Sequence, residues 1–311
     1  MLEKKCRITV FTPTYNRAYT LHRVWESLCQ QTCKDFIWLI IDDGSQDETK
    51  KIVEDFKEKS DFEIEYHYKE NGGRHTAVNY SYKFLRTEYV VTCDSDDELI
   101  DNAIESILNI WDSIPKEEYD RFWCISAREM NAETGEMVGK PYPKHINSLT
   151  GKKQRKLINK YPGEKHCCRK VAIHTQYKFP EYEDTKFVTE NTVWCVINKK
   201  YDQYCVNTII GKYHMDSKDS ISNKGMHSET HFCTSLHSGV FYINETFDEM
   251  PLKKLVINLI NISRCAMLTN TDYTKVMRSL NRWYKRVLVT FGYPISKVYI
   301  IIKNEKGTIK K

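Results

Sequence analysis

The residues with the clearest chemical capacity are three carboxylates that directly follow a short apolar run. The run 89–93 leads into Asp94-Ser95-Asp96-Asp97. A β-branched run of this length is typical of a buried strand, and open α/β sheets bind ligands beyond the carboxyl ends of their strands. Clustered carboxylates repel one another unless a cation lies between them, and Mg²⁺ or Mn²⁺ prefers such oxygen ligands. We therefore predict a metal–diphosphate site; the alternative is a solvated acidic turn before the helix expected from Leu99.

The elements that would position these acids follow from an alternation in the first hundred residues. Apolar runs and amphipathic stretches succeed one another, which predicts an α/β fold: a doubly wound, mostly parallel sheet with helices on both faces. The expected strands are 7–12, 36–41, 62–68 and 89–92, and the expected helices are 18–31, 47–59 and 74–85.

Polar loops follow three of these four strands. They are Thr14-Tyr15-Asn16, Asp42-Asp43-Gly44-Ser45 and the acidic stretch 94–97. Because the ends of parallel strands meet at one edge of a sheet, we expect the loops to converge. The chain has neither G-x-G-x-x-G after its first strand nor G-x-x-x-x-G-K-[ST], which excludes an ordinary dinucleotide site and a P-loop. A metal held by the acids would neutralise phosphates instead.

The second half of the chain alternates less strictly. We expect a helix over 99–111, a strand over 122–127 and a hairpin tip over 131–139, and the polar segment 216–222 reads as a loop that closes over a ligand. Further expected elements are a strand over 167–174, a helix over 184–198, a strand over 203–213 and helices from about residue 230. The last apolar stretch breaks at Gly292 and Pro294 and resumes at Val298.

Composition narrows the class of protein. The net charge of +5 over 311 residues is too mild to indicate nucleic-acid binding. Eleven Cys, an odd number without a CxxC pair, favour reduced thiols in the cytoplasm over a disulfide framework or a zinc site. No leader sequence is recognisable at the N-terminus, and no uninterrupted apolar run reaches the roughly 18–20 residues of a membrane-spanning helix.

Four motifs together resemble the inverting family 2 glycosyltransferases with a GT-A fold. They are Thr12-Pro13-Thr14-Tyr15-Asn16-Arg17, then Asp42-Asp43-Gly44-Ser45, then Asn71-Gly72-Gly73, and finally Asp94-Ser95-Asp96-Asp97. Each alone is weak, but all four occur in order on the expected strand ends, and they cover about residues 5–115. A softer match over 179–213 is similar to members that build bacterial surface polysaccharides.

The resemblance implies roles for particular residues. Asp43, supported by Asp42, would bind the base of a nucleotide, with uracil the expected base. Asp96 would contact Mn²⁺ or Mg²⁺, while Asp94 would lie nearer the ribose or sugar and Asp97 could share either duty. The remaining donor-site residues would be Thr12, Thr14, Tyr15 and Ser95. Arg74 follows a Gly-Gly turn at a helix start, which suits a phosphate or base contact as well as a solvated helix end.

Inverting transfer needs a base to deprotonate the attacking hydroxyl. The resemblance places that base in an acidic pair in the second half, where this chain has Glu190 followed by Asn191 instead of the usual Glu-Asp. Glu190 is therefore the predicted base, with Glu183 and Asp184 as alternatives and a plain helix-terminal acid as the structural explanation. His214 either completes the metal site or is an ordinary loop histidine.

The predicted organisation is a GT-A domain over 1–228, with a donor half (1–115) and an acceptor half (116–228), and a helical region over 229–311. Basic residues beside Trp, Tyr and Ile near the end of the chain favour contact with an anionic membrane or, alternatively, a homo-oligomer interface. The predicted reaction moves a sugar from a nucleotide-diphospho-sugar to a glycan or lipid-linked glycan. It would take place in the cytoplasm or at the inner face of the plasma membrane. The competing readings are a sugar-nucleotide-binding scaffold and a sugar nucleotidyltransferase.

Overall fold

The computed structural model describes residues 6–143, 148–149, 161, 163, 165–215 and 229–303. The chain divides into two compact units, and each is described by itself. Unit 1 comprises Met1–Lys178 and Ile197–Ser217, and unit 2 comprises Phe179–Val196 and Lys218–Lys311. The predicted polar loop over 216–222 lies outside the described residues.

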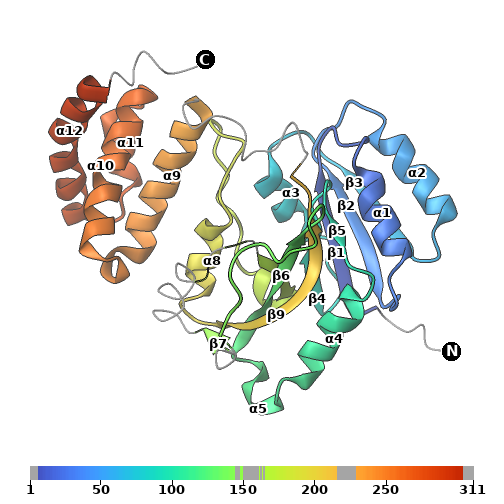
Figure 1. Ribbon diagram of the computed structural model, residues 1–311. Coiled ribbons are helices and arrows are strands. Elements are labelled where there is room, and N and C mark those ends of the chain that lie inside the picture. The colour runs from blue at the N-terminus through green and yellow to red at the C-terminus, as the bar shows by residue number, and fades with distance from the viewer. Residues whose placement is uncertain are drawn as a thin grey trace. The chain divides into compact units, whose positions relative to one another are not determined.

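Unit 1 is built on a parallel arrangement that the alternation of the sequence predicts. Its first strands are β1 (Ile8–Thr14), β2 (Phe36–Asp42), β3 (Glu63–Tyr68) and β4 (Tyr89–Thr92), paired in the order β3-β2-β1-β4 with every pair parallel (Figure 1). The connecting helices are α1 (Leu21–Cys29), α2 (Thr49–Lys59) and α3 (Arg74–Ser81). This confirms the expected α/β alternation.

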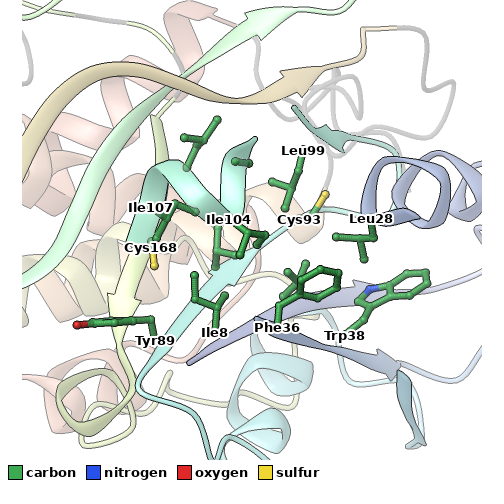
Figure 2. Close-up of a cluster of buried hydrophobic side chains, with 14 of the residues drawn as sticks. Ile8, Leu28, Phe36, Trp38, Tyr89, Cys93, Leu99, Ile104, Ile107 and Cys168 are labelled. Atoms are coloured by element: carbon green, nitrogen blue, oxygen red, sulfur yellow. The ribbon is translucent and has the colours of Figure 1, made fainter. Parts of the chain in front are cut away.

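One hydrophobic cluster fixes these strands against three of the helices. Ile8 of β1, Phe36 and Trp38 of β2 and Tyr89 of β4 pack with Leu28 of α1 (Figure 2). The same cluster takes in Val53 and Phe56 of α2 and Ile104 and Ile107 of α4 (Ala103–Ser113). None of the buried residues of α3 belongs to it, although α3 also packs on β1 and β2. Because successive side chains of a strand point to opposite faces, helices cover both faces of the sheet.

The later strands of unit 1 extend the same sheet with mixed pairing. Beyond β4 the order is β8-β6-β9-β5, and β7 (Ser148–Leu149) pairs with β9. β8 (Lys165–Lys170) is antiparallel to both β4 and β6 (Phe122–Asn131), while β6 and β9 (Asp202–Tyr213) are parallel. The short helices α5 (Lys116–Tyr119) and α7 (Val171–His174) flank β6 and β8 in the chain. The expected turn over 131–139 is confirmed by an antiparallel bridge between Met130 and Met137.

Two expected elements of this region are wrong in their extent. Leu99 does not begin a helix: it belongs to β5 (Glu98–Leu99), which pairs antiparallel with β9, and α4 starts only at Ala103. The expected strand over 167–174 ends at Lys170 and continues as α7. In both places the misassigned segment is too short to show a helical or strand periodicity of its own, so the sequence pattern joins it to the neighbouring element.

Unit 2 is helical. It contains α8 (Asn191–Ile197), which ends at the unit boundary, α9 (Glu229–Thr246), η2 (Phe247–Glu249), α10 (Leu252–Leu268), α11 (Tyr273–Ser279) and α12 (Trp283–Lys303). Its own core joins α9, α10, α11 and α12 through residues such as Ile243, Ile262, Val276 and Val289. None of the described helices is long and apolar enough to cross a membrane.

Two further expectations are corrected in unit 2. The helix expected over 184–198 is confined to Asn191–Ile197. The break expected at Gly292 and Pro294 is absent, because α12 runs through both residues. Gly292 faces α10 so closely that a Cβ would lie 2.8 Å from Ser263 Oγ and 2.9 Å from the Leu259 carbonyl oxygen. Tertiary packing therefore outweighs the helix-breaking tendency of the Gly-Tyr-Pro sequence.

Candidate functional site

The strand-end loops converge at the carboxyl edge of the parallel strands, as expected. Thr14 lies opposite Asp42 in the register of β1 and β2, and Phe11 lies opposite Thr92 in β1 and β4. The Asp43 backbone N–H donates to the Thr14 carbonyl oxygen at 2.8 Å. The sheet thus brings the first, second and fourth strand ends to one edge.

Side chains also tie the first two loops together. The Asn16 backbone N–H donates to Ser45 Oγ at 2.8 Å, and Asn16 Oδ1 accepts from the Gln46 N–H at 2.8 Å. Asn16 has a φ of 52°, a left-handed conformation that Asn tolerates better than most residues. Asp47 accepts from the Ala18 N–H at 3.0 Å. These bonds fix the loops before any ligand is present.

Asp42 and Asp43 are buried and fully engaged with the protein. Asp42 accepts from the Ser45 N–H at 2.8 Å and from the Tyr66 hydroxyl at 2.6 Å. Asp43 accepts from four donors: Lys69 Nζ at 2.5 Å, the Gly72 N–H at 3.0 Å, the Gly73 N–H at 2.7 Å and Asn71 Nδ2 at 3.1 Å. Asp43 therefore orders the Asn-Gly-Gly turn, in which Gly73 has a φ of 96°. A base contact by Asp43 stays a prediction.

The other residues expected around a nucleotide differ in their surroundings. Thr12 is buried, and its hydroxyl accepts from the Trp38 indole N–H at 2.9 Å. Thr14 is also buried, but its hydroxyl has no hydrogen-bond partner within the described part of the chain. Tyr15 is half-exposed and Ser95 is buried. Of this group, Thr14 offers an unsatisfied polar atom at the edge where a ligand is expected.

Two of the three acids after β4 are held by arginines. Arg74 Nη2 donates to Asp94 Oδ1 at 2.8 Å, and Arg17 Nη1 lies 3.6 Å from Asp96 Oδ2. Burial raises the pKa of Asp94, but the Arg74 guanidinium outweighs it and lowers the pKa below its usual value. Arg74 thus forms an ion pair with the D-x-D in this structure, and its expected contact with a phosphate or base stays a prediction. Arg17 is a second cation that sequence reasoning did not select.

Asp97 is the most buried of the three acids. Its Oδ1 accepts from the His214 backbone N–H at 3.0 Å. Burial and the nearby carboxylates of Asp94, Glu129 and Asp96 raise the pKa of Asp97 to about 9. The β5–β9 pairing brings His214 to this place, but its imidazole Nε2 lies 2.8 Å from Glu98 Oε1. The structure therefore joins His214 to the acids through its backbone.

Glu129 and His166 are the residues near this edge that sequence reasoning missed. His166 Nδ1 lies 2.9 Å from Glu129 Oε1, on the paired strands β8 and β6. Burial lowers the pKa of His166, yet Glu129 more than offsets that and the pKa is raised. Gly211 on β9 leaves room for the ring, because a Cβ there would lie 2.5 Å from His166 Nδ1. The position of Glu129 at the end of an apolar run was the available signal.

The donor set fits a hard divalent cation in its chemistry. Three carboxylates within four residues provide oxygen ligands of the kind that such a cation prefers. As arranged here, no group of three or more His, Cys, Asp or Glu among the described residues has the geometry of a metal site. Asp94 and Asp96 would have to exchange their arginine partners for the metal.

Glu190 belongs to unit 2. It precedes α8, where its carbonyl oxygen accepts from the Val193 and Trp194 N–H groups at 3.0 and 3.1 Å. Its alternative Asp184 is paired with His237, whose Nε2 lies 2.6 Å from Asp184 Oδ1. Glu190 thus lies at a helix start, as expected of it, and its role as base stays a prediction.

A comparison with protein families finds one whose model matches the chain. The model of Glycosyl transferase family 2 matches residues 9–169, which is more than half of the chain. These residues contain β1 apart from Ile8, β2 to β4, the four motifs and the Glu129–His166 pair.

Relatives of known sequence carry similar names. The chain is 27% identical over 224 residues to a GalNAc(5)-diNAcBac-PP-undecaprenol beta-1,3-glucosyltransferase of Campylobacter jejuni, covering 70% of this chain and 67% of that protein. It is 23% identical over 286 residues to a glycosyltransferase of Rickettsia bellii, covering 90% of this chain but 40% of the relative. The match to a glycosyltransferase of Rickettsia typhi covers 34% of that relative. The chain thus spans about a third to two fifths of the length of these Rickettsia relatives.

Solved structures share the fold. TarS residues 1-349 from S. aureus, in complex with UDP-GlcNAc, matches with a TM-score of 0.60 and 14% identity, covering 96% of this chain and 92% of TarS 1-349. A mannosyltransferase from Pyrobaculum calidifontis, in complex with GDP-Man and Mn²⁺, matches with a TM-score of 0.52 and 12% identity, covering 98% of this chain and 86% of that chain. At these identities the likeness shows the fold alone, and it confirms the GT-A type α/β fold expected from the sequence.

Proposed function

The chain belongs to glycosyl transferase family 2, and we propose that it transfers a sugar from a nucleotide-diphospho-sugar, with UDP as the nucleotide, to a hydroxyl of a glycan or lipid-linked glycan. The donor half is proposed to span 1–115, the acceptor half 116–228 and a helical C-terminal region 229–311. Family membership supports the reaction class. The UDP-GlcNAc complex of TarS and the lipid-linked substrate in the name of the Campylobacter relative support the choice of donor and acceptor.

The observation that carries this proposal is the convergence of three strand-end loops at one edge of a parallel sheet. Buried Thr14 offers an unsatisfied hydroxyl within the described residues, next to Asp42 and Asp43. Asp94 and Asp96 approach the same edge from β4 together with Arg74 and Arg17. Oxygen ligands and guanidinium groups side by side are what a metal-bound diphosphate needs.

Asp94, Asp96 and Asp97, with His214, would hold Mn²⁺ or Mg²⁺. When bound, such an ion acts as a Lewis acid on the diphosphate leaving group. Arg74 and Arg17, which pair with the acids in this structure, would then be free to orient the diphosphate oxygens. The Thr14 hydroxyl would donate a hydrogen bond to the nucleotide-sugar. Asp43 would hold the Asn-Gly-Gly turn that precedes Arg74.

Glu190 is the proposed base for the acceptor hydroxyl. A carboxylate at the start of α8 would accept the proton as the hydroxyl attacks the anomeric carbon from the side opposite the leaving group, so that the configuration inverts. An acceptor carried on a lipid would place this step in polysaccharide assembly at the inner face of the plasma membrane.

Thermal unfolding with a panel of nucleoside diphosphates, with and without Mn²⁺, tests the donor site. A ligand that binds only the folded state stabilises it by about 2.7 kcal/mol at a hundredfold excess over Kd. We expect a Mn²⁺-dependent rise in Tm with UDP in the wild type and little or none in Asp96→Ala. Asp61→Ala is the matched control, because Asp61 is an exposed carboxylate paired with Lys34 away from the acids.

Three outcomes separate the proposal from its rivals. Loss of the shift in both variants would point to a general effect of removing charge and would contradict the role of Asp96. A shift with UDP that needs no metal would overturn metal dependence. A shift without any turnover of UDP-sugars would favour a sugar-nucleotide-binding scaffold over a transferase.

A further inference from the structure

The last helix carries a continuous apolar stripe on its exposed side. Trp283, Val287, Phe291, Ile295, Val298 and Ile302 follow one another at intervals of four, four, four, three and four residues along α12. These six side chains, here called the α12 stripe, are 45–74% exposed. At about 100° per residue they span roughly a third of the helix circumference. The stripe exists because α12 continues through Gly292 and Pro294.

The opposite side of α12 is already used for packing inside unit 2. Val289 and Ile300 are buried in the core with α10, and Figure 1 shows α10 and α12 side by side. Ser263 Oγ of α10 donates to the Val289 carbonyl oxygen at 3.0 Å, and Ser296 Oγ donates to the Ile260 carbonyl oxygen at 2.8 Å. One side of α12 therefore packs inside unit 2, and the α12 stripe lies on the exposed side.

Charge indicates what kind of surface the stripe meets. Residues 252–303 contain ten Lys and Arg and one acid, Asp272. Lys297 is exposed on α12 itself, Arg282 is exposed just before it, and Lys253 and Lys254 are exposed at the start of α10. A second copy packed against the α12 stripe would bring Lys297 and the exposed basic residues beside it together with those of the first copy, which like-charge repulsion opposes. An anionic surface with an apolar layer beneath it matches both the basic residues and the apolar α12 stripe.

We propose that α12 lies along the surface of an anionic lipid bilayer, with the α12 stripe inserted at the boundary between headgroups and acyl chains. An amphipathic helix with an aromatic and aliphatic side and basic flanks binds membranes in this way. Each Lys or Arg near an anionic surface adds to the attraction. The inference deepens the proposed function by naming the surface that attaches the protein to a membrane. It rests on the proposed function only in taking the acceptor to be carried on a lipid.

Vesicle binding of the full chain tests the proposal without any turnover. The wild type is titrated with vesicles of phosphatidylcholine mixed with phosphatidylglycerol, and with vesicles of phosphatidylcholine alone. We expect binding to the mixed vesicles, much weaker binding to the neutral ones, and weakening at high salt because screening reduces the attraction. Equal binding to both vesicle types, or no binding to either, would overturn the proposal.

Two pairs of variants locate the surface. Phe291→Glu should weaken binding to the mixed vesicles by about tenfold or more, whereas Tyr68→Glu, at an exposed aromatic position on β3, should not. Lys297→Glu should weaken binding by about tenfold, whereas Lys51→Glu, with the same change in net charge, should not. Equal losses within a pair would contradict an attachment surface on α12.

Two further readouts keep the outcomes distinct. Phe291→Glu should melt at the temperature of the wild type and keep its UDP-induced shift, since position 291 is exposed and lies outside the donor loops. A failed vesicle test with an intact UDP shift would reject the membrane surface alone. If the wild type is an oligomer that Phe291→Glu dissociates, and vesicles do not bind, then a second copy covers the stripe and the proposal is wrong.

Discussion

At the scale of single residues, the candidate site is a set of carboxylates that the protein itself neutralises. Asp43 is saturated by four donors, and Asp94 and Asp96 are paired with Arg74 and Arg17. Such pairing lowers the cost of keeping acids together in the absence of a ligand. It also means that donor binding would exchange internal partners for the metal and the diphosphate.

Asp43→Asn tests the structural role of the most heavily engaged acid. An amide offers one acceptor oxygen and places an NH₂ group against N–H donors, so at least one of the Gly72 and Gly73 N–H groups loses its partner. We expect a loss of about 1–3 kcal/mol in the free energy of unfolding, measured by urea denaturation. Asp61→Asn, at an exposed position, should change it by less than about 0.5 kcal/mol. An Asp43→Asn variant as stable as the wild type would contradict this role.

Glu190→Gln tests the proposed base. The substitution keeps the shape and removes the proton acceptor, so sugar transfer should fall by about a hundredfold or more, while the UDP-induced rise in Tm should stay. Asp184→Asn is the comparison, because Asp184 is the alternative acid and is engaged with His237. If Asp184→Asn abolishes transfer and Glu190→Gln does not, the assignment is reversed.

At the scale of elements, the strands that build the site were predictable and several later elements were not. Runs such as 36–41 are apolar throughout and bounded by polar loops, which specifies a buried parallel strand. β5 was missed because two residues of strand exist only through pairing with β9. Pro294 was read as a break because the sequence alone does not reveal the packing of Gly292 against Ser263. Long-range packing decided both cases.

The same reasoning explains which site residues the sequence could supply. The motifs at residues 12–17, 42–45 and 94–97 each follow a strand, so their convergence is a consequence of parallel pairing. Glu129 and His166 come together only because β6 and β8 are antiparallel neighbours. No local spacing encodes that pairing, since 36 residues separate the two in the chain.

Gly292→Ala tests the packing that makes α12 continuous. In an exposed helix this change would stabilise by about 1 kcal/mol, but here the new Cβ would meet the Leu259 carbonyl oxygen at 2.9 Å. We expect a net loss of about 1–3 kcal/mol in the free energy of unfolding of unit 2. Lys297→Ala on the same helix is the control and should be nearly neutral. A stabilised Gly292→Ala variant would show that α10 and α12 are not in this close contact.

At the scale of the whole molecule, ion pairs at the amino end of the strands make stability depend on pH. Arg7, just before β1, joins Glu88 before β4 and Asp112 of α4 at the amino end of the strands, with Arg7 Nη2 2.8 Å from Asp112 Oδ1 and Arg7 Nε 3.3 Å from Glu88 Oε2. Burial raises the pKa of Glu88, but hydrogen bonds from Tyr89, Tyr119 and Arg7 outweigh it and lower the pKa. The hydrogen bond from Arg7 is the main reason that the pKa of Asp112 is also lowered.

These lowered pKa values give a sign for the pH dependence of stability. A carboxyl group whose pKa is lower in the folded state stabilises the fold above its unfolded pKa and loses that contribution as pH falls through its folded pKa. Arg7→Met should therefore cost up to about 1 kcal/mol at neutral pH, since the partners are partly exposed, and should flatten the decline in stability below pH 4.5. The free energy of unfolding is measured by urea denaturation at a series of pH values. An equal decline below pH 4.5 in the wild type and Arg7→Met would contradict this account.

The measurement that tests the central claim most directly is release of UDP from UDP-sugars by the wild type, Asp96→Ala and Asp61→Ala, each with Mn²⁺ and with a chelator. The claim is that the carboxyl edge of the parallel strands in unit 1 binds and activates a nucleotide-sugar. It predicts metal-dependent UDP release in the wild type and Asp61→Ala, and loss of that release in Asp96→Ala. Release by Asp96→Ala at the rate of the wild type would place the chemistry elsewhere in the molecule.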